Sequence, residues 1–394
     1  MKKNNILIIT ELFPNKRFPQ LGTFVVNQVD YLKQYYNITI ITPVYFGFKL
    51  FYKKEIKENG ISIIRVRQPI LILSIIRRLF KVPKHVIFSW NKYFISKKIY
   101  KTAKKLNNNK DFKLIIGHES GAGDEACLVA EKLNKPSIFH LHGIYEYHLK
   151  SFGKTGMKKI LKNINKASYI ISVSGVAINS YIKNNLIVSN TSTIPNILNK
   201  NICSYQNVEW EHVMKNKKVI LGVGWLVKEK GFNNLITIAK KLKNYKDVLI
   251  IIIGNGPEYK NYQNLISELD LKNIHIIKKV EPKNIGFFYK NSYVLVHPSE
   301  VDSFSMVCLE AMSYGKPIIC TDRIGIAEYI KNEQEGFIIE LNDNNQLFKK
   351  ILTLIENQTL KKEMGRKAYI TSQNFKYDII GKQINNIYKK YTNA

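Results

Sequence analysis

Short apolar runs and helical segments alternate along almost the whole chain. Each run has the length of a buried strand and is bounded by turn residues, so the pattern predicts parallel sheets joined by crossover helices, an α/β fold. We predict strands in the first half at residues 6–10, 38–42, 61–66, 114–117, 137–140, 169–173 and 193–195. In the second half we predict them at residues 219–223, 248–253, 274–277, 293–296, 317–321 and 336–339.

The length of the chain indicates more than one domain. A sequence of 394 residues exceeds what one ordinary core supports. We predict two Rossmann-like, doubly wound domains that face each other across a cleft, residues 1–196 and 218–375, with a polar, irregular linker at 197–217. The apolar periodicity of residues 377–391 predicts a last helix within 376–394. In such folds ligands bind at the carboxyl ends of the strands.

The net charge of +31 is unevenly distributed. Residues 1–200 contain 33 Lys and Arg against 10 Asp and Glu, whereas residues 201–394 contain 28 against 20. Residues 59–110 contain 13 basic residues and no acid. An AT-rich genome also produces many Lys, Asn, Ile and Tyr, which would explain the lysine total but not the asymmetry. We therefore expect an anionic partner at the first half.

One basic segment has the composition of a membrane-surface segment. Residues 65–105 contain 12 basic residues, and apolar side chains between positions 70 and 80 lie beside Arg77, Arg78 and Lys81. Such a mixture suits an interfacial segment on an anionic leaflet. A buried helix whose lysines face water is the alternative.

The location of the protein can also be inferred from the sequence. No apolar run approaches the roughly 20 residues of a membrane span. The first ten residues predict a strand rather than a signal peptide. The four cysteines lie far apart without metal-type spacing, which predicts buried thiols in a reducing compartment. We expect a cytoplasmic protein, peripheral on the inner face of the cell membrane.

Residues 293–317 combine a strand, a polar loop and the start of a helix. We predict the helix at 307–314, with Asp302, Ser303 and Ser305 as candidate N-caps. Free backbone N–H groups at such a helix start suit a diphosphate. Asp302 and Glu310 are eight positions apart, roughly 12 Å along a helix, so they could address different parts of one extended ligand. A capped helix with an incidental acid is the alternative.

Other candidate ligand contacts follow predicted strands. Gly22 opens a helix after the first strand and permits close backbone approach. His142 ends the strand that also contains His140, and His118 ends the preceding strand. Each has an ordinary structural explanation, a turn glycine or a core histidine. The second half adds a glycine after each of two strands and a loop lysine, which are Gly224, Gly254 and Lys230.

In their order along the chain, these motifs resemble the retaining glycosyltransferases of the GT-B fold, the group 1 or family 4-like enzymes with a Glu-x7-Glu motif. The resemblance covers essentially the whole chain. The family pattern Pro-Ser-x-x-Glu-Gly-Phe-Gly, followed by Glu-Ala-Met, reads here Pro298-Ser299-Glu300-Val301-Asp302-Ser303-Phe304-Ser305, then Glu310-Ala311-Met312.

The resemblance implies an enzyme of class EC 2.4. It would move a sugar from a UDP- or GDP-sugar to a glycan acceptor, as in capsule, O-antigen or cell-wall glycan synthesis. With the positive charge, this favours a lipid-linked acceptor held by the first domain, while the second domain binds the donor and the last helix crosses back to the first. The implied catalytic residues are His142, Asp302 and Lys230. The implied donor-binding residues are Gly22, Gly224, Lys230, Gly254, Ser305, Met306, Val307 and Glu310.

The sequence departs from the family pattern at several positions. Asp302 replaces Glu, Ser303 and Ser305 replace glycines, and Trp225 stands where an Arg that holds phosphate is usual. No Asp-x-Asp pair occurs, so we expect no metal ion. A non-hydrolysing sugar-nucleotide epimerase on the same fold is an alternative. The positive charge alone also suggests a nucleic-acid-binding protein, but no recognised binding motif supports a nucleic-acid partner.

Overall fold

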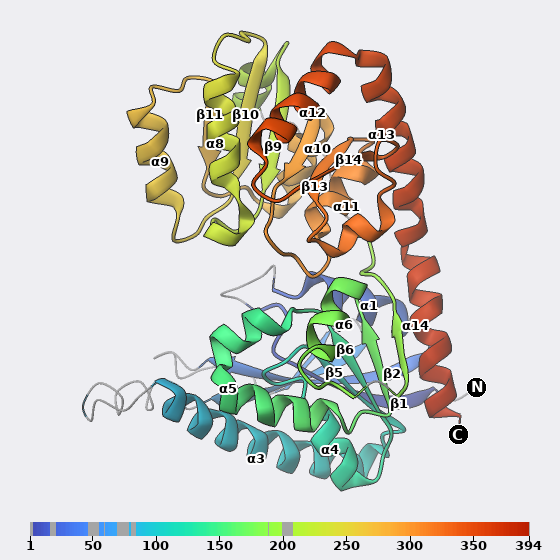
Figure 1. Ribbon diagram of the computed structural model, residues 1–394. Helices are drawn as coiled ribbons and strands as arrows, with labels where there is room; N and C mark the ends of the chain where they lie inside the picture. The colour runs from blue at the N-terminus through green and yellow to red at the C-terminus, as the bar shows by residue number, and fades with distance from the viewer. Residues whose placement is uncertain are drawn as a thin grey trace. The chain divides into compact units, whose positions relative to one another are not determined.

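The computed structural model describes residues 3–15, 21–45, 55–58, 60–68, 79, 84–187, 189–198 and 208–393. The chain divides into two compact units (Figure 1). Unit 1 comprises Met1–Ile197 and Tyr377–Ala394, and unit 2 comprises Leu198–Lys376. In the described residues, no helix is both long enough and apolar enough to cross a membrane.

Unit 1 contains an eight-stranded sheet with the order β3-β4-β2-β1-β5-β6-β7-β8. All its neighbouring strands are parallel except β3 and β4. The predictions of strands in this half are confirmed except for two details. The antiparallel β3 has no apolar run to reveal it, and β8 shares only residue 193 with the predicted strand 193–195. The bounds are β1 Asn4–Thr10, β2 Tyr36–Tyr45, β3 Glu55–Glu58, β4 Ile61–Gln68, β5 Leu114–His118, β6 Ser137–Leu141, β7 Tyr169–Ser172 and β8 Thr191–Thr193.

The helices of unit 1 include the last helix of the chain. Their bounds are α1 Thr23–Leu32, α3 Lys84–Lys110, α4 Glu125–Leu133, α5 Tyr145–Ile164, α6 Gly175–Ile182 and α14 Tyr377–Thr392. Helix α14 packs along α1, where a Cβ on Gly381 would lie 2.4 Å from the Tyr31 ring (Figure 1). The buried Tyr388 of α14 also reaches His140 of β6, 2.8 Å from its Nε2. The last helix is therefore part of the core of unit 1.

Unit 2 contains a six-stranded, fully parallel sheet with the order β11-β10-β9-β12-β13-β14. Its strands are β9 Lys218–Val223, β10 Val248–Ile253, β11 Ile274–Ile277, β12 Val294–His297, β13 Ile318–Thr321 and β14 Gly336–Ile339. Its α-helices are α7 Val208–Met214, α8 Phe232–Lys241, α9 Tyr259–Glu268, α10 Ile285–Asn291, α11 Met306–Ser313, α12 Asn344–Glu356 and α13 Gln358–Ser372. Helix α7 lies within residues 197–217, which we predicted to be irregular.

Both sheets reverse their direction of winding at one strand. In unit 1, β1 lies between β2 and β5, and in unit 2, β9 lies between β10 and β12. Where the winding reverses, the loops that follow two neighbouring strands diverge and leave room for a ligand at their carboxyl ends. This places the loops after β1 and β5 in unit 1, and after β9 and β12 in unit 2, at the positions where a site is expected.

Candidate active site

In unit 2 the loop after β9 is bonded to the loop after β12. The amide of Glu300 donates to the carbonyl of Glu229 at 2.7 Å, and the Ser299 hydroxyl donates to the same carbonyl at 3.1 Å. Gly231 has a left-handed φ of 67°, and a Cβ there would lie 2.1 Å from the carbonyl oxygen of Pro298. Only glycine tolerates both conditions. These contacts bring together two segments about 70 residues apart in the sequence.

The joined loops place Lys230 against Asp302. Lys230 Nζ lies 2.6 Å from Asp302 Oδ2, and His297 Nε2 lies 3.1 Å from the same oxygen. Burial alone would raise the pKa of Asp302, but the charge of Lys230 and the hydrogen bond from His297 outweigh it and hold the pKa below its usual range. Burial lowers the pKa of His297, so at neutral pH an uncharged imidazole donates its Nε2 proton. Lys230 and Asp302 are each about four-fifths buried and remain partly accessible.

The start of α11 adjoins this pair. Ser305 is the N-cap residue, with a left-handed φ of 80° and no side-chain capping bond. Its hydroxyl lies 3.3 Å from Cys308 Sγ instead. Ser305, one of the three predicted candidates, is therefore the N-cap residue, but its hydroxyl does not bond to a helix amide. The first amides of a helix have no intrahelical partner, so those of Met306 and Val307 suit an anion.

Glu310 lies one turn further along α11. Its Oε2 accepts a hydrogen bond of 2.8 Å from the hydroxyl of Tyr289, a fully buried residue of α10. Burial raises the pKa of Glu310 to about 7, although the bond from Tyr289 opposes the shift. A carboxylate has two oxygens, so one remains for a ligand hydroxyl. Ionisation of Glu310 near neutral pH therefore depends on what binds beside it.

The two predicted donor glycines of unit 2 contact each other. A Cβ on Gly254 would lie 1.8 Å from the carbonyl oxygen of Gly224, so the ends of β9 and β10 approach through these residues. This contact explains why position 254 has no side chain without invoking a ligand. Trp225, which follows Gly224, has 58% of its surface exposed.

In unit 1 the structure places Gly22 at the start of α1 and His142 just after β6. Gly22 has a left-handed φ of 67°, and a Cβ there would lie 2.1 Å from the carbonyl oxygen of Leu12. His142 is 7% exposed and packs on Phe24 of α1, with 4.4 Å between the ring centroids. Burial lowers the pKa of His142 to about 3, so the ring is uncharged at neutral pH.

Three histidines of unit 1, His118, His140 and His142, form one buried network. One nitrogen from each ring lies within 4.8 Å of the others, a spacing at which the three could bind a metal ion. His118 Nδ1 and His142 Nε2, however, lie 3.0 Å apart, and the planes of the two rings differ by only 14°. The two nitrogens therefore form a hydrogen bond in the plane of the rings. His140 Nε2 is directed to the hydroxyl of Tyr388 at 2.8 Å. The geometry is therefore that of hydrogen-bonded neutral rings rather than of nitrogens that converge on an ion.

Comparisons with known proteins identify the family. The family described as "Glycosyl transferases group 1" matches residues 206–371. An uncharacterized glycosyltransferase of Methanocaldococcus jannaschii is 30% identical over 297 residues, which cover 74% of this chain and 79% of the relative. The chain is a group 1 glycosyltransferase. The family and enzyme class predicted from the sequence are thereby confirmed.

Solved structures confirm the predicted GT-B fold of this glycosyltransferase. A sucrose-phosphate synthase from Thermosynechococcus elongatus aligns over 99% of both chains, with a TM-score of 0.77 at 16% identity. The Anabaena protein HepE was solved in complex with UDP-glucose. It aligns over 98% of this chain and 99% of its own chain, with a TM-score of 0.72 at 20% identity.

Two further relatives have names that describe their acceptors or pathways. A capsular polysaccharide biosynthesis glycosyltransferase of Staphylococcus aureus is 27% identical over 59% of this chain and 65% of its own length. An N-acetylgalactosaminyltransferase of Campylobacter jejuni, named for a diphospho-undecaprenol acceptor, is 26% identical over 42% of this chain and 45% of its own length.

Unit 1 of this glycosyltransferase also contains a group of buried acids that we did not predict from the sequence. Lys92 of α3 forms ion pairs of 2.6 Å with Asp124 and 2.9 Å with Glu125. Glu119, directly after β5, lies 3.2 Å from His148 Nε2, and burial raises its pKa to about 7. Burial also raises the pKa of Glu11, after β1, to about 7. Glu11, Glu119, Asp124 and Glu125 are four of the ten acidic residues in 1–200. Their clustering after two predicted strands is the sequence pattern that could have revealed this group.

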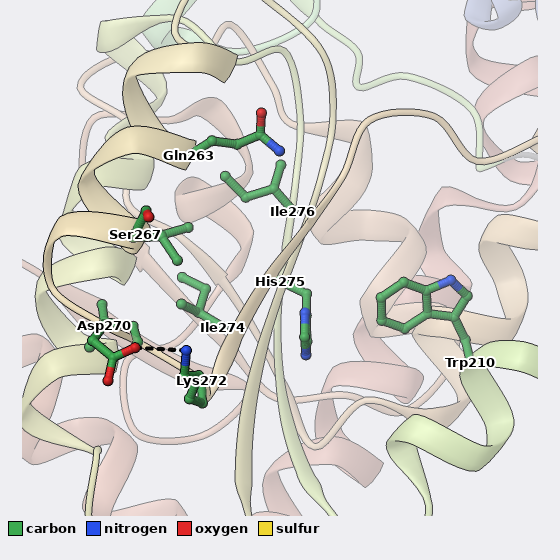
Figure 2. A pocket seen from close by; sticks show the side chains of 10 residues that line it. Trp210, Gln263, Ser267, Asp270, Lys272, Ile274, His275 and Ile276 are labelled. Carbon is green, nitrogen blue, oxygen red and sulfur yellow. Dashed lines mark ion pairs between the residues drawn. The ribbon is translucent and has the colours of Figure 1, made fainter.

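A pocket of about 480 Å³ lies elsewhere on unit 2 (Figure 2). Figure 2 shows Trp210 and His275 on one side of it and the ion pair of Asp270 with Lys272 on the other. Asp270 and Lys272 precede β11, so this part of the pocket is at the amino end of an edge strand. Because the candidate site lies at the carboxyl ends of β9 and β12, the pocket is not part of it.

Proposed function

We propose that this enzyme transfers a sugar from a nucleotide-sugar donor with retention of the anomeric configuration. The observation that carries the proposal is the Lys230–Asp302 pair, 2.6 Å apart, beside the start of α11 at the point where the winding of unit 2 reverses. A diphosphate leaving group needs cations or aligned N–H dipoles where negative charge develops. Lys230 has N–H groups beyond the one given to Asp302, and α11 adds the amides of Met306 and Val307.

The proposed roles follow the family resemblance residue by residue. Asp302 contacts the donor sugar, and its ion pair with Lys230 keeps it ionised. Glu310 accepts hydrogen bonds from the ribose, with its orientation supported by Tyr289. His142 of unit 1 contacts the donor sugar as an uncharged ring. Gly22, Gly224 and Gly254 keep the backbone close to the donor.

The proposed chemistry needs no protein nucleophile. The bond between the anomeric carbon and the diphosphate oxygen breaks while the acceptor oxygen bonds to the same face of that carbon. The acceptor proton passes to the leaving phosphate, so the products are a glycoside and a nucleoside diphosphate. The donor phosphates are neutralised by Lys230 and the α11 amides, and no metal ion takes part.

The acceptor we propose is a lipid-linked glycan of surface polysaccharide synthesis, bound by unit 1 at the cytoplasmic face of the membrane. The names of the Staphylococcus aureus and Campylobacter jejuni relatives support this class of acceptor. The positive charge of residues 1–200 supports an anionic carrier such as a lipid diphosphate.

A surface of α3 supports membrane contact. Trp90, Tyr93 and Phe94 are 43%, 55% and 47% exposed, and four of the five exposed lysines between residues 97 and 105 continue this side of the helix. We call this the α3 surface, which comprises Trp90, Tyr93, Phe94, Lys97, Lys101, Lys104 and Lys105. Aromatic rings and cations together suit an anionic lipid interface. The apolar segment that we predicted at positions 70–80 lies, except for residue 79, outside the described residues.

Product analysis tests this proposal. The enzyme is incubated with UDP- and GDP-sugars and a lipid-diphosphate-linked acceptor, and the products are examined by NMR and mass spectrometry. We expect a nucleoside diphosphate and a new glycosidic bond with the anomeric configuration of the donor. An inverted linkage would contradict retention. An altered free nucleotide sugar without transfer would mean that the protein is an epimerase.

A further inference from the structure

Trp225 follows the strand where the winding of unit 2 reverses, and the proposed roles do not use it. The other loops at this edge belong to the neighbours of β9, which are β10 and β12. The ring has 58% of its surface exposed, although the next residue, Leu226, is fully buried. Single exposed apolar side chains are common, so exposure alone assigns no role to the ring. Its backbone provides the stronger argument.

The residues on both sides of Trp225 are held by the turn after β10. The Gly224 amide donates to the backbone carbonyl of Ile253 at 3.0 Å, and the Leu226 amide donates to the backbone carbonyl of Asn255 at 2.8 Å. This turn approaches so closely that a Cβ on Gly254 would lie 1.8 Å from the Gly224 carbonyl oxygen. A Cβ on Gly256 would lie 2.3 Å from the carbonyl oxygen of Leu226. The backbone on both sides of Trp225 is therefore fixed, and with it the direction of the Trp225 Cα–Cβ bond.

The same short loop contains Lys230. Two successive backbone hydrogen bonds connect Trp225 to Lys230. The Val227 amide donates to the carbonyl of Trp225 at 2.9 Å, and the Lys230 amide donates to the carbonyl of Val227 at 3.1 Å. A nucleotide sugar has a ring on each side of its diphosphate, the nucleobase and the sugar. With the diphosphate at Lys230, one of these rings lies within reach of the loop. Indole faces stack on both kinds of ring, and such stacking contributes to affinity without any charge.

We propose that Trp225 is a stacking platform for the donor ring that adjoins the diphosphate. This inference rests on the proposed nucleotide-sugar site. Binding should then depend on the aromatic face at this position and not on positive charge.

The first test is tryptophan fluorescence. The chain contains three tryptophans, so the double variant Trp90→Phe, Trp210→Phe leaves Trp225 as the only reporter. We expect saturable quenching or a spectral shift on titration with UDP-glucose. A full response to UDP alone assigns the nucleobase as the stacked ring, whereas a response only to UDP-glucose assigns the sugar. Unchanged emission, while calorimetry on the same variant measures binding, would overturn the inference.

Substitutions at position 225 give an independent test that does not need the double variant. We expect Trp225→Ala to raise the Kd for UDP-glucose about tenfold, which corresponds to about 1.4 kcal/mol. Trp225→Phe should remain within about threefold of wild type, and Tyr369→Ala, the control at a 47% exposed aromatic residue of α13, should change nothing. If Trp225→Ala binds as tightly as wild type, only the stacking role is wrong. If wild type binds neither UDP- nor GDP-sugars, the proposed function is wrong as well.

Discussion

Glu310, which we propose to contact the donor ribose, is buried at a cost to its ionised form. Burial raises its pKa from 4.5 to about 7, so the folded state retains a proton that the unfolded state has lost between these values. Glu310 should therefore make the protein less stable as the pH rises from about 4.5 to 7, with no further loss above. An ionised carboxylate accepts ribose hydrogen bonds more strongly, so the same titration should strengthen donor binding.

Glu310→Gln tests this titration. Glutamine can still accept the hydrogen bond from Tyr289 but does not ionise. At pH 8 we expect the variant to be more stable than wild type, by on the order of 1–3 kcal/mol, and at pH 5 to be close to it. Urea unfolding at both pH values measures the difference. An equal difference at pH 5 and pH 8 would contradict the raised pKa. Donor affinity should fall in the variant at pH 8.

At the scale of elements, Gly231 joins the loops after β9 and β12. In Gly231→Ala the new Cβ would lie 2.1 Å from the carbonyl oxygen of Pro298, so the loops must separate and the Lys230–Asp302 pair must break. Gly60 of unit 1 is the control, since it also has a positive φ, of 78°, and a Cβ there would meet nothing within 4 Å. We expect Gly231→Ala to lose donor affinity at least tenfold and Gly60→Ala to keep it, as measured by calorimetry. Equal affinities would contradict a structural role for the joined loops.

The α3 surface gives a second prediction at this scale. Each cation near an anionic leaflet contributes about 1 kcal/mol. Reversing Lys97, Lys101 and Lys104 to Glu should therefore abolish sedimentation with phosphatidylglycerol vesicles at low salt. The control variant replaces three exposed lysines of unit 2, Lys240, Lys243 and Lys272, with Glu and should still sediment with the vesicles. Wild-type binding should disappear at 1 M salt, where the Debye length is about 3 Å. Equal pelleting with neutral vesicles, or none with anionic ones, would contradict electrostatic docking.

For the whole molecule, the strand pattern was the most predictable feature. Strands buried on both faces consist of apolar runs such as 248–253, which a sequence reveals directly. Strand β3, with the sequence Glu-Ile-Lys-Glu, has no such run and was missed. The Lys230–Asp302 contact joins residues 72 positions apart and depends on how two loops pack, so no local pattern predicts it. The left-handed backbone of Ser305 was also unpredictable, because serine at that position favours an ordinary cap.

Metal dependence is a property of the whole enzyme. We expect transfer to survive excess EDTA, because in the proposed site Lys230 and the α11 amides neutralise the charge of the leaving group. Nucleoside diphosphate release, followed with and without the chelator, measures this. Loss of activity that Mn²⁺ restores would contradict the proposed metal-free site, and the same assay on His118→Ala would then test whether the histidine network binds the ion.

Calorimetric titration of the nucleotide-sugar donor tests the central claim, that the diphosphate binds beside Lys230. The donor used is whichever of the UDP- and GDP-sugars stabilises wild type in a thermal scan. A ligand at 100 times its Kd adds about 2.7 kcal/mol to the free energy of unfolding, which such a scan detects. We predict that Lys230→Ala raises the Kd at least tenfold. Lys350→Ala, which removes another ion-paired lysine of unit 2, 2.9 Å from Glu333, should leave the Kd unchanged. A folded Lys230→Ala variant that binds the donor as tightly as wild type would contradict the account.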